Sequence, residues 1–167
     1  ERERERESER ERARACARER RRIERGGMLR GTAESSCDSC SAPFAVEGMN
    51  IVPLPVYHGK GFISLGFLIG NIAYISDVSE IPEKTFGLLA GAETVVMDAL
   101  REAPHHNSHF TLGQAVDALR RIGPRLGLLT GLGHDLDHEG TEAWLESNVP
   151  ELPIKAAYDG MALPLVL

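Results

Sequence analysis

Three side chains that commonly bind metal ions follow predicted β-strands. His58 and Asp77 each come directly after a strand, and His134 lies four residues beyond another, in a glycine-flanked loop. The carboxyl ends of strands in a layered α/β fold can meet at one edge of the sheet, where loops carry functional residues. Two imidazoles and a carboxylate are suitable ligands for zinc, manganese or iron(II). The sequence therefore predicts a divalent metal site formed by these three residues.

Each of these residues also has an ordinary structural interpretation. His58 precedes a glycine and could be a loop histidine, and Asp77 could form a turn or cap the helix that follows. His134 and His138 are four residues apart, which suits either a helical zinc pair or two solvated histidines at the start of a helix. Only convergence of the three side chains in space would favour the metal site over these alternatives.

A further residue, His109, is suited to proton transfer. It lies just ahead of Thr111, which forms a capping-box pair with Gln114 at the start of the best predicted helix. A histidine fixed beside the first turn of a helix can act as a general acid or base near neutral pH. The alternative is a loop histidine bonded to the backbone. His105 and His106 complete an HHxxH spacing, but the neighbouring proline and Asn-Ser pair indicate a loop, so the spacing is weak evidence for zinc.

The predicted elements mix hairpins with strand–helix alternation. Strands are predicted at 51–57, 62–69, 72–76, 93–98, 126–130, 154–158 and 161–166, and helices at 82–89, 111–122 and 138–147. The pairs Gly70-Asn71 and Asp159-Gly160 are two-residue connections typical of hairpins. Pro53 and Pro55 place the first strand at a sheet edge, because proline cannot donate a ladder hydrogen bond. We expect an α/β fold in which helices cover one face of a mixed sheet.

Charge is distributed unevenly along the 167 residues. Residues 1–30 hold 12 Arg and 8 Glu, whereas the rest of the chain holds 7 Lys and Arg against 17 Asp and Glu. An acidic body argues against nucleic-acid binding and suits a pocket that concentrates divalent cations. No apolar run is long enough to span a membrane. An odd cysteine count, with one isolated CxxC at Cys37–Cys40, indicates a reduced cytoplasmic protein rather than a disulfide framework.

Composition divides the chain into three parts. Residues 1–27 form a low-complexity Arg/Glu leader with almost no apolar face, which we interpret as disordered or as a solvated helix. Residues 28–49 are rich in glycine, serine and cysteine and are interpreted as a linker or a remnant first strand. Residues 50–167 carry the predicted strands and helices and form the globular part.

Several short segments, taken together, carry a resemblance to a known family. They are Pro53–Gly59, Ser64–Phe67, Tyr74–Ser79, Asp98–Arg101, Ser108–Phe110, Leu128–Glu139 and Tyr158–Met161. Their order and spacing resemble the metallo-β-lactamase superfamily, in particular its phosphoribosyl cyclic phosphate phosphodiesterase branch. The resemblance implies an incomplete β-lactamase-like αββα sandwich and a site for divalent zinc or manganese. It also implies that His58 binds one ion, that Asp77 bridges two, and that His109 assists the leaving group or activates water.

The sequence departs from this family at two places. The main ligand signature of the family, HxHxDH, is absent, and Gly131 stands where the bacterial enzymes have their last ligand histidine. His134, in the same loop, is our candidate to replace that histidine. We interpret the absent signature as the loss of a stretch ahead of His58. The resulting expectation is a metal-dependent hydrolase of small-molecule phosphodiesters or related esters, with a non-catalytic remnant or interaction module as the alternative.

Overall fold

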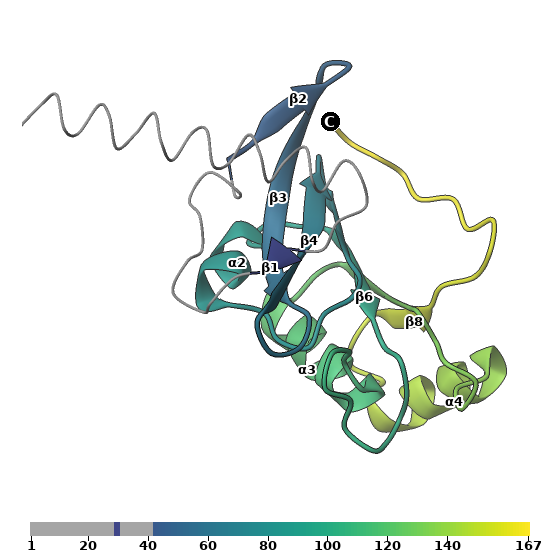
Figure 1. Ribbon diagram of the computed structural model, residues 1–167. Helices are drawn as coiled ribbons and strands as arrows, with labels where there is room; N and C mark the ends of the chain where they lie inside the picture. The colour runs from purple at the N-terminus through teal and green to yellow at the C-terminus, as the bar shows by residue number, and fades with distance from the viewer. Residues whose placement is uncertain (1–28, 31–41) are drawn as a thin grey trace, which may run out of the picture.

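The computed structural model describes residues 29–30 and 42–167, whose strands form one mixed sheet (Figure 1). The strands are β1 (Leu29–Arg30), β2 (Phe44–Val46), β3 (Met49–Tyr57), β4 (Phe62–Ile69), β5 (Ile72–Ile75), β6 (Thr94–Asp98), β7 (Leu126–Thr130) and β8 (Ile154–Ala156). From β2 to β8 they lie side by side in chain order, and β1 pairs with β4. The predicted leader 1–27 and the CxxC at Cys37–Cys40 lie outside the described residues.

The sheet changes from antiparallel to parallel pairing at β5. Strands β3, β4 and β5 form successive antiparallel pairs, whereas β5, β6, β7 and β8 run parallel. The predicted two-residue turn at Gly70-Asn71 is confirmed, because Ile69 pairs directly with Ile72. Two antiparallel steps bring β3 into the same direction as β5. The carboxyl ends of β3, β5, β6 and β7 therefore share one edge of the sheet.

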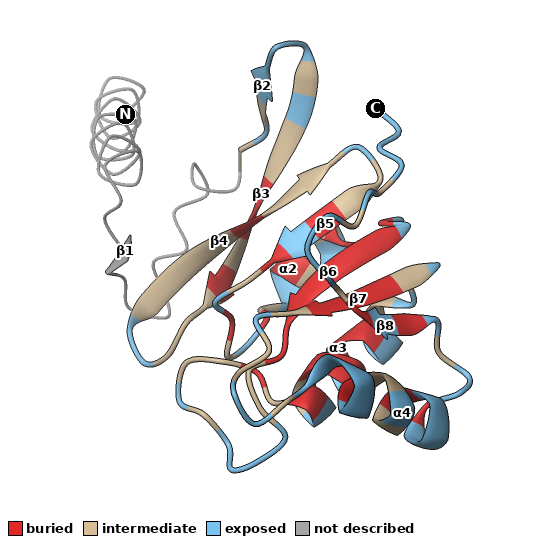
Figure 2. Ribbon diagram, turned by 90° about the vertical axis from the view of Figure 1, so that its right-hand side faces the viewer, coloured by how far each residue is buried: buried red, intermediate tan, exposed pale blue. Residues whose placement is uncertain are grey.

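Helices cover one face of this sheet, as the sequence predicted. They are α2 (Glu83–Leu88), α3 (Leu112–Ile122) and α4 (His138–Asn148). A single apolar core contains alternate strand residues such as Ala73, Val95 and Leu129 together with Leu119 of α3 and Leu145 of α4. Every residue of β6 is buried (Figure 2), as expected for a parallel strand at the centre of a sheet.

Helix α3 begins and ends as its sequence predicts. The Thr111 side chain accepts a hydrogen bond from the Gln114 backbone N–H, and the Gln114 side chain accepts one from the Thr111 N–H, which completes the capping box. Gly123 ends the helix in the left-handed conformation that glycine adopts without strain. The segment just before the helix, including His109, is thereby held against the sheet edge.

Proline explains an irregular edge near the start of the sheet. The short strand β2, which the sequence analysis assigned to the linker, pairs with β3 only at residues 49–51. Pro53 and Pro55 lie beyond that pairing and face β4 on their other side, opposite Phe67 and Leu65. The edge predicted from the prolines is therefore local to this part of β3.

The predicted terminal hairpin at 154–158 and 161–166 is not formed. Strand β8 ends at Ala156 and pairs only with β7, and residues 161–166 are not a strand. Val166 instead donates to the Asn71 side chain and accepts from the Asn71 N–H, at 2.9 and 3.1 Å. These bonds hold the C-terminal segment against the β4–β5 turn. The predicted hairpin is absent because residues 161–166 bond to this distant turn and not to residues 154–158. Within the described ranges, each helix is too short or too polar to traverse a lipid bilayer.

Candidate metal centre

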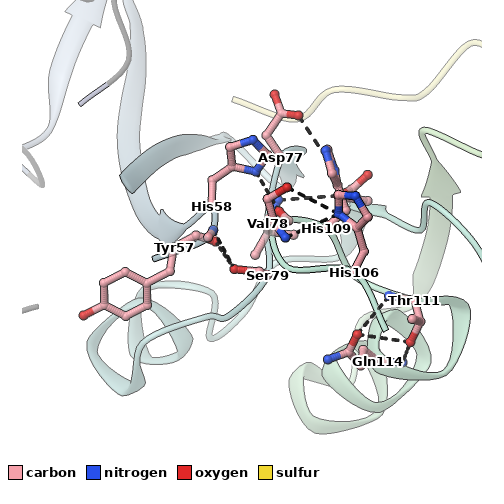
Figure 3. A network of polar contacts seen from close by, with 12 residues as sticks. Tyr57, His58, Asp77, Val78, Ser79, His106, His109, Thr111 and Gln114 are labelled. Carbon is pink, nitrogen blue, oxygen red and sulfur yellow. Dashed lines mark hydrogen bonds and ion pairs between the residues drawn. The ribbon is translucent and has the colours of Figure 1, made fainter. Parts of the chain in front are cut away.

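The shared carboxyl edge of the sheet brings three potential metal ligands together (Figure 3). His58 follows β3, Asp77 follows β5, and His109 comes from the loop before α3. Each offers one ligand atom, and these atoms all lie within 4.8 Å of one another. His58 and His109 are half-buried and Asp77 is exposed, so the group stands at the surface with access for a ligand.

His58 is oriented by a backbone carbonyl. Its Nδ1 lies 2.7 Å from the carbonyl oxygen of Ser108, so Nδ1 carries the hydrogen and donates it. The Nε2 atom is then the one with a free lone pair. The neighbouring Gly59 adopts a φ of +78° and donates its N–H to the Ser79 hydroxyl at 2.9 Å. This turn fixes the direction in which the His58 side chain leaves the strand.

Asp77 occupies a backbone conformation that is rare for residues other than glycine. Its φ is +53°. Such strained residues cost about 1–3 kcal/mol and are retained where the surroundings enforce them, often at functional sites. Here the flanking chain is well fixed, because Val78 is fully buried and the Ser79 N–H donates to the Tyr57 carbonyl at 2.7 Å. The geometry turns the Asp77 carboxylate towards the two histidines.

His109 is held by Asp98, a buried carboxylate that sequence reasoning did not assign to the site. The His109 Nδ1 and the Asp98 Oδ2 are 2.7 Å apart, and Asp98 is only 3% exposed. Burial raises the pKa of Asp98 above its usual value, while the hydrogen bond with His109 opposes that shift. The His58 and His109 rings also meet edge to face at 4.8 Å between centroids. Asp98 is the only charged residue of β6, at its carboxyl end, and this position was the available signal in the sequence.

His134 does not belong to this group of ligand atoms among the residues that the structure describes. It is exposed in the turn ahead of α4, and its role as a ligand stays a prediction. His138 is the first residue of α4, so the two histidines are not one helical pair. Gly131 lies closer to the site, since a Cβ placed there would be 2.7 Å from the Asp98 Oδ1.

The donor set fits a divalent cation. Imidazole and carboxylate together suit zinc, manganese or iron(II). Histidines that bind metals usually donate their other ring N–H to a carbonyl or carboxylate, which fixes the ring. His58 does so to Ser108, and His109 has the same relation to Asp98. The residues present therefore fit a site for a divalent metal ion.

The protein thus has an α/β fold with a mixed sheet, and a His/Asp group suited to metal binding lies at the carboxyl ends of its strands. Residues 8–131 match the family model described as the Beta-lactamase superfamily domain. Because this match covers most of the chain, the protein belongs to the metallo-β-lactamase superfamily, and its fold is an incomplete form of the αββα sandwich.

Two solved structures resemble the chain. A diphosphatase from the PhnP family is 32% identical with a TM-score of 0.69, over 76% of this chain and 47% of its own. Zinc-bound PqqB from Methylobacterium extorquens shares 14% identity and a TM-score of 0.60, over 75% of this chain and 54% of its own, and is similar in fold alone. The chain thus spans about half the length of these structures.

A curated relative of different activity also matches. An octanoyltransferase from Porphyromonas gingivalis is 31% identical over 119 residues, which are 71% of this chain and 23% of that protein. The match covers less than a quarter of the octanoyltransferase, so the activity of that whole protein is not transferred to this chain.

Proposed function

We propose that this protein is a metal-dependent hydrolase acting on phosphodiester or related ester bonds of small molecules. The observation that carries the proposal is the convergence of His58, Asp77 and His109, whose ligand atoms all lie within 4.8 Å. The similarity to a diphosphatase at 32% identity supports a phosphorylated compound as the substrate class.

His58 and Asp77 would hold the cation, with His134 as the further ligand proposed from the sequence. A bound zinc or manganese ion supplies Lewis-acid stabilisation of the charge that develops on a phosphoryl group. The exposed Asp77 has two carboxylate oxygens, and the half-buried His58 has its free nitrogen after Nδ1 has bonded to Ser108. Both side chains are available at the same surface for this purpose.

His109 would transfer a proton to the leaving group. Its Nδ1 is bonded to the buried Asp98, which fixes the orientation of the ring. The remaining nitrogen is then free to exchange a proton with substrate. Asp98 acts through His109 as a positioning residue.

Metal content tests this proposal directly. We expect purified chain supplied with manganese or zinc to retain near-stoichiometric metal, measured by plasma mass spectrometry. His58→Ala and Asp77→Ala should each lose most of it. His105→Ala, an exposed histidine of the neighbouring loop, is the matched control and should keep the metal. If both the His58 and the Asp77 variants retained all of their metal, the proposed metal site would be wrong. His134→Ala tests the sequence-based ligand in the same assay.

Hydrolysis of bis-p-nitrophenyl phosphate with added manganese tests the activity. We expect turnover that depends on metal and falls roughly 100- to 10,000-fold in His109→Ala, because general acid–base groups contribute about that much. The same variant should keep its metal if His109 moves protons. A His109→Ala protein that has lost its metal would make His109 a ligand instead.

The alternative is a non-catalytic interaction module. It is favoured by one observation, namely that His134 lies outside the group of ligand atoms from His58, Asp77 and His109 among the described residues. The same metal measurement separates the two functions, because a non-catalytic module predicts neither retained metal nor turnover by the wild-type chain.

A further inference from the structure

The arginines of residues 42–167 differ in their ion pairing. Arg120, Arg121 and Arg125 each face a carboxylate, although their side chains are between 46% and 82% exposed. Arg101 is less exposed than any of them, and its Nε is buried with no hydrogen-bond partner. Among the described residues, no carboxylate is paired with its guanidinium.

This lack of a partner is unusual for two reasons. Buried polar atoms in folded proteins are almost always hydrogen-bonded, because burial removes their bonds to water. Residues 42–167 also contain 15 Asp and Glu against 7 Lys and Arg, so carboxylates are abundant. A half-buried guanidinium left unpaired in an acidic protein indicates a position that an external anion would occupy. The planar fork of arginine binds phosphate and carboxylate oxygens in pairs.

Arg101 lies next to the candidate metal centre. Its carbonyl accepts from the Leu112 N–H at 2.8 Å, and its backbone pairs with Thr111, so segments 98–101 and 109–112 run side by side. Asp98 bonds to His109 at one end of this pairing, and Arg101 lies at the other end.

We propose that Arg101 is an anion-binding residue that holds the phosphoryl oxygens of a phosphate ester beside His58, Asp77 and His109. The catalytic consequence rests on the proposed hydrolase function. Binding of the anion itself needs only the guanidinium and the adjoining loop. A substrate held at both the cation site and Arg101 would have its ester bond fixed near the His109 ring.

Inorganic phosphate is the probe for this proposal. Calorimetric titration of the full chain, first treated with chelator and then with manganese restored, should show phosphate binding in both states. Arg101→Gln should weaken that binding roughly 10- to 100-fold, as expected for a lost hydrogen-bonded charge. Arg101→Lys should give an intermediate loss, because it keeps the charge without the fork. The control Arg125→Gln, at an 82% exposed side chain, should bind as the wild type does.

Metal content and turnover separate this inference from the proposed function. Arg101→Gln should keep its metal and raise KM for bis-p-nitrophenyl phosphate more than it lowers kcat. If that variant fails to fold by circular dichroism, Arg101→Lys carries the comparison. Phosphate binding that is absent in the wild type, or unchanged in both Arg101 variants, would overturn the inference. If the chain never retains metal but still binds phosphate through Arg101, the inference about Arg101 stands and the proposed hydrolase function is rejected.

Discussion

A buried carboxylate orients the residue that we assign to proton transfer. Asp98 is 3% exposed and lies 2.7 Å from His109, so the position of the His109 ring depends on it. The sequence showed Asp98 as the last residue of a predicted strand and as part of the Asp98–Arg101 segment of the family resemblance, without a role at the site. His58 and Asp77 were easier to predict, because each directly follows a strand that pattern alone identifies. Whether an aspartate at a strand end is a cap, a ligand or a positioning group depends on what it faces.

At this residue scale we predict the effect of Asp98→Asn. Asparagine keeps the shape but replaces the carboxylate that holds the His109 ring, so turnover should fall roughly 10- to 100-fold, as for other partners of site histidines. The pH–rate profile should shift as well, whereas metal content should stay near the wild-type value. The control is Asp135→Asn, in the exposed turn ahead of α4. Equal turnover in the two variants would contradict the role of Asp98.

Helix α3 links local sequence signals to the position of the site. Its capping box lies two residues after His109, so the helix start and the proton-transfer residue share one short segment. Thr111→Ala should lower the free energy of unfolding by about 1 kcal/mol, the usual cost of losing an N-cap. Urea denaturation would measure this cost, with Asp117→Ala on the exposed face of the same helix as the control. An unchanged unfolding midpoint for Thr111→Ala would show that the cap adds no stability.

Helices α2 and α3 are joined by an ion pair that predicts a pH dependence. Arg121 donates two hydrogen bonds to the Glu83 carboxylate and packs 3.7 Å from the centre of the Phe86 ring. The hydrogen bond from Arg121 lowers the pKa of Glu83 from 4.5, so the folded state binds this proton more weakly than the unfolded state. The stabilisation is therefore present above pH 4.5 and is lost as the pH falls through the lower folded pKa.

The test of this pair is the difference in thermal midpoint between wild type and Glu83→Gln. We expect a small stabilisation of the wild type at pH 7 that disappears at strongly acidic pH and decreases with added salt. Glu93→Gln, which removes the looser 3.9 Å pair with Arg125, is the matched control. A difference that grows as the pH falls would contradict the assigned sign.

At the scale of the whole molecule, the C-terminal segment returns across the sheet to the β4–β5 turn (Figure 1). Gly70 allows this approach, because a Cβ there would collide with the carbonyl oxygen of Val166, and its φ is +54°. Gly91 also has a positive φ, of +90°, but a Cβ there would meet nothing within 4 Å. A substitution at either glycine would therefore strain the backbone, and the two positions differ in the contact with the C-terminus.

We predict that Gly70→Ala destabilises the protein more than Gly91→Ala does. Both should lose about 1–3 kcal/mol from the left-handed conformation. Only Gly70→Ala should also release residues 157–167, which limited proteolysis followed by mass spectrometry would detect. Equal denaturation midpoints and equal proteolysis of the two variants would mean that the C-terminal contact contributes nothing to the fold.

The sequence by itself determined the local elements of this protein. The Gly70-Asn71 turn, the capped helix α3 and the buried strand β6 follow from turn residues, capping residues and periodicity, which act within a few positions along the chain. The prediction of a terminal hairpin was wrong because Val166 forms hydrogen bonds with Asn71, 95 residues away. Likewise, His58 bonds to Ser108 across 50 residues, and His109 meets Asp98 only where the pairing of β6 places it. Such contacts depend on strand order and register across the sheet, so tertiary structure decided the site.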